Sequence, residues 1–158
     1  MKTRLFSRGL LVALFASASL FLVSCDKDDD DNDDVMFDIS GNATGAQEVP
    51  AVNTTATGTL VGTYNRNTNV LTYNISWVGL SGNVTVAHFH GPADNGESAS
   101  PLIDLVVSTN GLSGNITGSA TLTDEVEDYL LDGKLYYNLH TVLNPNGEIR
   151  GQVNADED

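Results

Sequence analysis

The stretch NVLTYNISWV, residues 69–78, decides the fold class of this chain of 158 residues. Apolar and polar side chains alternate along it, which is the pattern of a β-strand with one buried face and one solvated face. The apolar positions are Leu71, Tyr73, Ile75 and Trp77. Residues 54–64 lie on the other side of the turn NRNT, residues 65–68, and have a strand-like composition. The two runs together predict a β-hairpin.

Five further runs have the composition of strands, and turns rich in glycine, asparagine and proline separate them. They are residues 83–90, 102–107, 115–123, 134–141 and 148–154. Residues 124–131 predict one or two helical turns with Asp124 as the N-terminal cap. Strands and helices do not alternate along the chain, which argues against a parallel α/β fold. We therefore expect an all-β domain of seven or eight antiparallel strands, either a Greek-key sandwich or a barrel.

Both ends of the chain differ in composition from this domain, which we expect over residues 36–154. Residues 1–24 begin with basic side chains and continue as an apolar run, which is typical of a signal peptide. That run ends in LVSC, residues 22–25, which resembles the lipobox of bacterial lipoproteins and implies that Cys25 becomes lipidated. The acidic tract that follows cannot bury its charges, so residues 25–35 are expected to form a disordered tether. Residues 155–158 would form a short acidic tail.

These end segments predict an exported protein that the lipid on Cys25 holds to the bacterial cell envelope. An acidic tract directly after the lipid cysteine resembles the export signals of surface lipoproteins in some Gram-negative bacteria. We therefore expect an outer-membrane protein, exposed on the cell surface if the tract acts as an address and not only as a tether. The formal net charge of −14 at pH 7 argues against nucleic acid as a partner. The residues do not identify a protein or glycan ligand.

The three histidines of the chain lie in two short motifs, AHFHGP at residues 87–92 and NLHT at residues 138–141. Three neutral imidazoles from two strands suit Cu(II) or Zn(II), so His88, His90 and His140 are candidate metal ligands, with copper before zinc. The residues that could support such a site are Asp94, Glu97 or Asp104 as a nearby carboxylate, and Asn138 or Glu148 as a partner that orients a ring nitrogen. In the structural alternative the rings hydrogen-bond the turns beside them, and Glu148 and Arg150 form a cross-strand ion pair.

The direction in which the histidines point is left open by the sequence. In a regular strand His88 and His90 share a face with Val84 and Val86, and a β-bulge would change that parity. In the second motif His140 falls on the face opposite to the apolar side chains of its strand. The segment that follows His90, residues 93–101, reads as a flexible surface loop and as the wall of any ligand site.

Five segments of the chain resemble the CHRD (chordin-type) domain, from about residue 39 to residue 153. They are GAQEVP at 45–50, ATG at 56–58, AHFHGPA at 87–93, LYYNLHT at 135–141 and NPNGEIRGQV at 144–153. The resemblance implies an all-β domain, immunoglobulin-like or barrel-shaped. The domain occurs in chordin, an extracellular antagonist of bone-morphogenetic-protein signalling, and in many bacterial exported proteins. The growth-factor partner of chordin does not transfer to a bacterial lipoprotein.

A weaker likeness connects the chain to the copper/zinc superoxide dismutases, which are Greek-key barrels with a His-x-His strand. The chain lacks further histidines for their copper and zinc sites, and its only cysteine is Cys25. These departures from the dismutase pattern argue against dismutase activity. The sequence gives no indication of a Ser-His-Asp catalytic triad either. The sequence therefore predicts a binding or structural module and not an enzyme. The first alternative is a mononuclear copper or zinc protein, and the second is a metal-dependent redox enzyme with an open coordination position.

Overall fold

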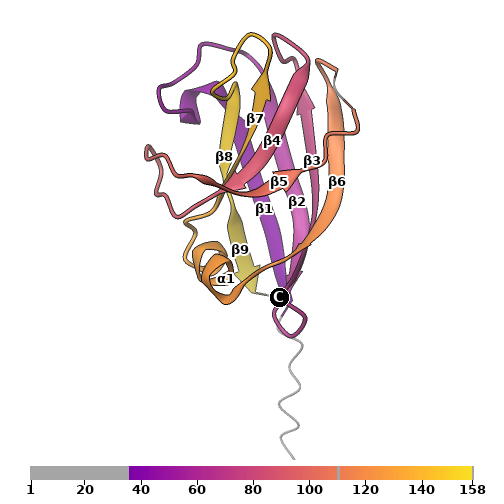
Figure 1. The fold of residues 1–158 in the computed structure, drawn as a ribbon, viewed down its shortest axis with the longest axis vertical. Coiled ribbons are helices and arrows are strands. Elements are labelled where there is room, and N and C mark those ends of the chain that lie inside the picture. The colour runs from indigo at the N-terminus through magenta and orange to yellow at the C-terminus, as the bar shows by residue number, and fades with distance from the viewer. Residues whose placement is uncertain (1–35, 110, 158) are drawn as a thin grey trace, which may run out of the picture. The chain divides into compact units, whose positions relative to one another are not determined.

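A computed structural model of the chain describes residues 36–109 and 111–157. These residues form nine strands, one α-helix and one 3-10 helix (Figure 1). The strands are β1 (Met36–Thr44), β2 (Thr57–Asn65), β3 (Val70–Val78), β4 (Val84–His90), β5 (Pro101–Leu105), β6 (Gly114–Thr121), β7 (Tyr136–Thr141), β8 (Ile149–Gln152) and β9 (Asn154–Glu157), and the helices are η1 (Gly45–Gln47) and α1 (Asp124–Leu131). The predicted all-β fold is confirmed, with nine strands where the sequence predicted seven or eight; β1 was not among the predicted runs. The predicted signal peptide, Cys25 and the acidic tether lie outside the described residues.

The strands form a single antiparallel sheet that curls into a nearly closed barrel (Figure 1). Their order is β5-β4-β7-β8-β1-β2-β3-β6. Strand β9 is not part of this order and pairs with β1. The predicted hairpin is confirmed as β2 and β3, which pair over their whole length. The sheet also brings together strands that are distant in sequence, since β4 pairs with β7 and β3 with β6. The two histidine motifs therefore lie on neighbouring strands.

The core of the barrel is built from the inward face of each long strand. The alternation seen at residues 69–78 is present in β3, where Leu71, Tyr73, Ile75 and Trp77 are buried and the polar side chains between them are exposed. Tyr73 of β3 and Phe89 of β4 meet edge to face, with ring centroids 5.4 Å apart. Each large apolar side chain in such a core contributes about 1.5–3 kcal/mol through burial. The fully buried members include Leu60, Tyr64, Leu71, Ile75, Phe89, Ile116, Leu135, Tyr137, Leu139 and Ile149.

A β-bulge in β4 decides which way the first two histidines face. The register between β4 and β7 shifts between Val84 and Val86, so Val84 is buried while Val86 is 44% exposed. Beyond the shift, Phe89 points into the core. His88 and His90 therefore lie on the outer face of the barrel, because neighbouring residues of a strand point to opposite faces.

Two local features differ from the sequence-based expectations. The N-terminal cap of α1 is Thr123 and not Asp124, because the Thr123 hydroxyl accepts a hydrogen bond from the N–H of Val126 at 3.4 Å. Residues 148–154 do not form one strand, since β8 ends at Gln152 and β9 then pairs with β1. Residues 155–157, which we expected in an acidic tail, are thus part of the sheet. No helix within the described ranges is long and apolar enough to cross a bilayer.

Candidate metal centre

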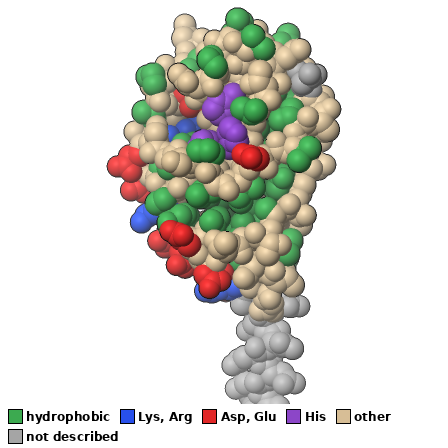
Figure 2. Space-filling model, viewed as in Figure 1, with side chains coloured by type: hydrophobic (Ala, Val, Ile, Leu, Met, Phe, Trp, Pro, Cys, Tyr) green, Lys and Arg blue, Asp and Glu red, His purple; other side chains and the backbone are tan. Residues whose placement is uncertain are grey.

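The outer face of β4, β7 and β8 carries a row of polar side chains set by the strand register. His88 lies opposite Asn138 on β7, and Asn138 lies opposite Arg150 on β8. On the other side of β4, His88 lies opposite Asp104 on β5. Residues facing each other across antiparallel strands come within about 5.5 Å, so the row forms one continuous polar strip. The histidines are visible at this face of the molecule (Figure 2).

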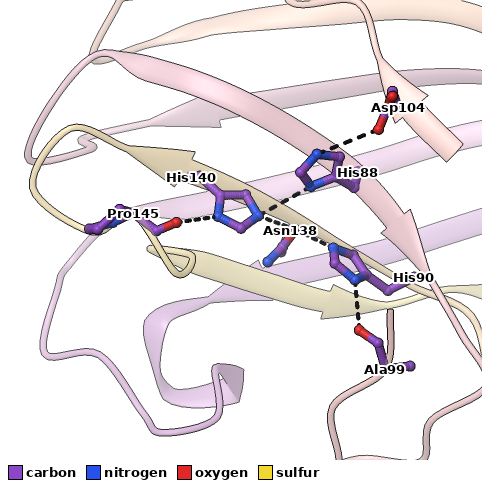
Figure 3. Close-up of polar contacts among 7 residues, drawn as sticks. All are labelled: His88, His90, Ala99, Asp104, Asn138, His140 and Pro145. Carbon is purple, nitrogen blue, oxygen red and sulfur yellow. Dashed lines mark hydrogen bonds and ion pairs between the residues drawn. The ribbon is translucent and has the colours of Figure 1, made fainter. Parts of the chain in front are cut away.

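The pairing of β4 with β7 brings all three histidines together. One ring nitrogen from each of His88, His90 and His140 lies within 4.8 Å of the other two. The ring centroid of His140 is 5.0 Å from that of His88 and 6.4 Å from that of His90. Nδ1 of His88 lies 3.3 Å from Nε2 of His140 (Figure 3). The residues that the sequence singled out as candidate ligands thus form one cluster.

The ring nitrogens that point away from the cluster each face an oxygen. Nδ1 of His90 donates to the carbonyl of Ala99 at 3.0 Å, and Nδ1 of His140 donates to the carbonyl of Pro145 at 2.9 Å. Nε2 of His88 lies 3.6 Å from Oδ1 of Asp104. A carbonyl oxygen has no proton to give, so His90 and His140 carry theirs on Nδ1. When these rings are neutral, their Nε2 atoms carry lone pairs that point into the cluster.

The electrostatic environment favours neutral rings on β4. Burial lowers the pKa of His88 below its usual 6.5, and His140 lowers it further while Asp104 opposes the shift. Burial also lowers the pKa of His90 below 6.5, against an opposing hydrogen bond with Ala99. Both rings are therefore neutral at neutral pH, which is the form that binds metal ions.

Asn138 lies inside the cluster, and the side chain of Glu48 lies near the Asn138 amide. Oδ1 of Asn138 is 3.0 Å from Nε2 of His90 and 3.0 Å from Nε2 of His140. Glu48, which follows η1, is only 8% exposed, and its Oε1 has no hydrogen-bond partner among the described residues. Burial raises the pKa of Glu48 to about 7, against the opposing effects of Arg150 and of the nearby Asn138 amide. Sequence reasoning missed Glu48, and its only signal was its place in the GAQEVP segment.

Tyr136 and Arg150 hold the loop that follows His90. The Tyr136 ring stacks on the His90 ring with centroids 4.7 Å apart and 6° between the planes, and the Arg150 guanidinium lies 3.5 Å from the centroid of the same Tyr136 ring. Arg150 donates to the carbonyl of Glu97, and the Tyr136 hydroxyl to the carbonyl of Ala99. The loop that we expected to be flexible is thus tied to the strands at several backbone atoms.

Glu148 and Arg150 do not form the ion pair that the sequence suggested. Glu148 is fully buried, and five hydrogen bonds of 2.7–3.1 Å from Thr54, Ser81, Thr141 and Asn144 occupy both of its oxygens. Its acceptors are therefore already satisfied, while Arg150 is engaged by loop carbonyls and by Tyr136. Glu148 does not orient a histidine either. The ion pairs of the described residues are Arg66–Glu127, His88–Asp104 and Lys134–Asp132.

The three candidate carboxylates have different outcomes. Asp104 faces His88 from the outer side of the cluster. Asp94 and Glu97 lie on the loop tied by Arg150 and are not part of the group of side chains that could share a metal ion, which consists of the three histidines. Only Asp104 therefore keeps a supporting role among them.

Comparison with known protein families gives a match to the model described as CHRD domain over residues 39–153. Comparison with curated proteins and with solved structures gives no match. The matched range begins in β1 and ends just after β8, so it contains all three histidines and the row of polar side chains around them.

Proposed function

The chain belongs to the CHRD domain family, and we propose that this member is a metal-binding module of the bacterial cell envelope. Its ligand would be a divalent transition metal ion, copper before zinc. His88 would bind the ion through Nδ1, and His90 and His140 would bind it through Nε2. The lipid on Cys25 would hold the domain to the membrane.

The main support for the proposal is that the two nitrogens of each histidine ring have different surroundings. The nitrogens that point outward face oxygen atoms of Asp104, Ala99 and Pro145. Metal-binding histidines in proteins have this arrangement, because an acceptor on the outer nitrogen fixes the tautomer and the ring orientation. The structural alternative accounts for the outer contacts with the turns. It also accounts for one inner contact, since Nδ1 of His88 can donate to Nε2 of His140 at 3.3 Å. It leaves Nε2 of His90 facing Oδ1 of Asn138, which is a second acceptor.

The separation of the inner nitrogens fits a first-row ion after a small adjustment. Bonds of about 2.0–2.1 Å place two nitrogens at most about 4.2 Å apart, and the group spans up to 4.8 Å. His88 is the ring that can move, because its side chain is 17% exposed and its partner Asp104 is 93% exposed. Imidazole donors suit copper and zinc, and divalent copper binds such sites more tightly than zinc does.

Isothermal titration calorimetry with CuCl₂ and ZnCl₂ on the purified full-length protein in detergent tests the proposal. We expect one ion per chain, and we expect His88→Ala to weaken binding at least about tenfold. A variant in which all three histidines are alanine keeps the acidic residues of the chain and therefore measures their contribution separately. Binding that is absent, or equal in the wild type and the triple variant, would refute the metal proposal.

Membrane attachment has its own test. The support for it is the LVSC segment that ends the apolar N-terminal run. We expect Cys25→Ala to release the protein from the membrane fraction of producing cells. Fractionation followed by immunoblotting measures the release. Persistence of the Cys25→Ala variant in the membrane fraction would contradict lipid anchoring while leaving metal binding unaffected.

A further inference from the structure

Asn138 contacts two of the three histidines through a single atom. Its Oδ1 lies 3.0 Å from Nε2 of His90 and 3.0 Å from Nε2 of His140 (Figure 3). The side chain comes from the middle of β7 and is only 3% exposed. Water therefore does not separate the amide from the two rings, and the polar atoms must satisfy one another.

The two outer hydrogen bonds leave no ring proton for these contacts. His90 and His140 each donate from Nδ1 to a carbonyl oxygen, so both Nε2 atoms are acceptors, and Oδ1 is an acceptor as well. Three buried acceptors facing one another are unfavourable unless a cation lies among them or the amide is turned over. A turned amide would donate from Nδ2 to the two rings and would make the cluster a closed hydrogen-bond network.

Glu48 favours the orientation in which the amide oxygen faces the rings. A Cβ atom placed on Gly147 would collide with Oε1 of Glu48 and would lie 2.9 Å from Nδ2 of Asn138, so these two atoms border the same small space. A carboxyl group offers an acceptor oxygen in either protonation state, and the amide nitrogen is a donor. Turning the amide over would instead bring its oxygen towards these acceptor oxygens. Glu48 is therefore a positioning residue for Asn138.

We propose that Oδ1 of Asn138 is the fourth donor atom of the metal centre, which makes the donor set three imidazole nitrogens and one amide oxygen. This inference rests on the proposed metal-binding function. In a tetrahedral site with bonds of about 2.0–2.1 Å, neighbouring donor atoms lie about 3.4 Å apart. The separations of 3.0 Å from Oδ1 to each Nε2 and of 3.3 Å between His88 and His140 are close to that value.

The donor set has a consequence for the ion that is bound. An amide oxygen is a hard donor, and Cu(I) prefers soft sulfur donors. The site therefore selects Cu(II) and Zn(II) over Cu(I). It is a site for holding a divalent ion, and reduction of bound Cu(II) would weaken its binding.

The test compares Cu(II) binding by the full-length protein and by Asn138→Ala at about pH 8, above the ordinary imidazole pKa of ~6.5. We expect Asn138→Ala to weaken binding at least about tenfold. We also expect it to add a bound water, seen as broadening of the Cu(II) paramagnetic resonance signal in ¹⁷O-enriched water. Asn74→Ala removes an exposed strand asparagine and controls for the substitution itself.

Each other outcome is decisive. A turned-over amide blocks the nitrogens by hydrogen bonding, so Asn138→Ala would then bind Cu(II) as tightly as the wild type or more tightly. That result would overturn the role of Asn138 and leave the three-histidine site in place. Absence of Cu(II) binding by the wild type would overturn both proposals.

A second variant, Asn138→Asp, keeps the proposal testable if Asn138→Ala misfolds. Asn138→Asp keeps an oxygen at the donor position, so we expect no additional bound water relative to the wild type. A loss of bound water in Asn138→Asp would instead show that the wild-type amide does not coordinate. Circular dichroism of each variant without metal shows whether the fold is retained.

Discussion

Two buried polar clusters lie close together in this barrel, and they differ in how completely they are satisfied. Glu148 receives five hydrogen bonds from four neighbouring residues. The histidine cluster instead directs three ring nitrogens and an amide oxygen at one another. The first cluster is complete without any further atom. The second would be completed by the metal ion that we propose.

The two clusters differ in whether their acceptors are matched by donors, which separates a structural polar cluster from one that could bind an ion. A structural cluster pairs each acceptor with a donor, because an unpaired buried polar atom costs about 1–3 kcal/mol. In the histidine cluster, the carbonyl oxygens of Ala99 and Pro145 accept from the outer ring nitrogens. Inside it, Oδ1 of Asn138 faces two Nε2 atoms that are acceptors as well. Both clusters contain residues of the segments that resemble the CHRD domain, so membership in a family motif does not by itself separate the two roles.

The largest expected effect is loss of stability when the complete cluster is broken. Glu148→Ala leaves several buried donors without an acceptor, and we expect it to lower the free energy of unfolding by about 3–5 kcal/mol. Urea denaturation followed by tryptophan fluorescence measures the change. Glu157→Ala, at an exposed position of β9, should change stability by about 0.5 kcal/mol or less. Similar values for the two variants would remove the distinction between the clusters.

The next effect is stabilisation of the incomplete cluster by its ion. Free Cu(II) at about 100 times its dissociation constant should raise the free energy of unfolding by about 2.7 kcal/mol, and excess EDTA should reverse the change. The thermal unfolding midpoint with and without metal measures it. His88→Ala should lose most of the shift. An equal shift in the variant with all three histidines replaced would place the ion elsewhere.

A smaller effect is expected at the exposed edge of the histidine cluster. Asp104→Ala removes the oxygen that faces Nε2 of His88, and since Asp104 is 93% exposed we expect metal affinity to fall by about tenfold at most. Calorimetric titration measures it. Asp94→Ala removes the same charge from the neighbouring loop and should leave the affinity unchanged. Equal losses in both variants would indicate a general charge effect and no specific role for Asp104.

The smallest effect is the acid dependence of the complete cluster. Burial alone would raise the pKa of Glu148, but hydrogen bonds from Ser81, Thr141 and Thr54 outweigh it and hold the pKa below the ordinary 4.5. A carboxyl with a lowered folded-state pKa contributes stability above its unfolded pKa and loses that contribution as the pH falls. The wild type should therefore lose stability relative to Glu148→Gln below a pH of about 4.5. Parallel profiles in urea denaturation at several pH values would contradict this.

Much of the fold could be predicted because it depends on local alternation. The apolar period in residues 69–78 and the NRNT turn predicted the β2–β3 hairpin, which the structure confirms. The position of His140 on the face opposite to Leu135 and Leu139 followed from the same rule. The facing of His88 and His90 could not be predicted, because the bulge between Val84 and Val86 depends on how β4 pairs with β7.

The residues around the histidines were harder to predict from the sequence than the histidines themselves. Imidazoles are rare in this chain and their chemistry is specific, so composition alone singled them out. Glu48 comes to the site from the segment after η1, and nothing in its own sequence neighbourhood indicates that it lies behind Asn138. The suggested Glu148–Arg150 ion pair was wrong for a related reason. The partners that each residue has instead, such as Ser81 and Tyr136, come from other parts of the chain.

Most of the strands, much of the apolar core and the three candidate metal ligands can be predicted from the sequence, because they depend on side-chain type and on the two-residue period of a strand. Only the tertiary structure decided that β4 and β7 are neighbours and that the outer nitrogens of the three rings face oxygens. Strand pairing over some 50 residues of sequence separation, as between His88 and Asn138, is a property of the whole sheet. It depends on the packing of the core and not on any single segment.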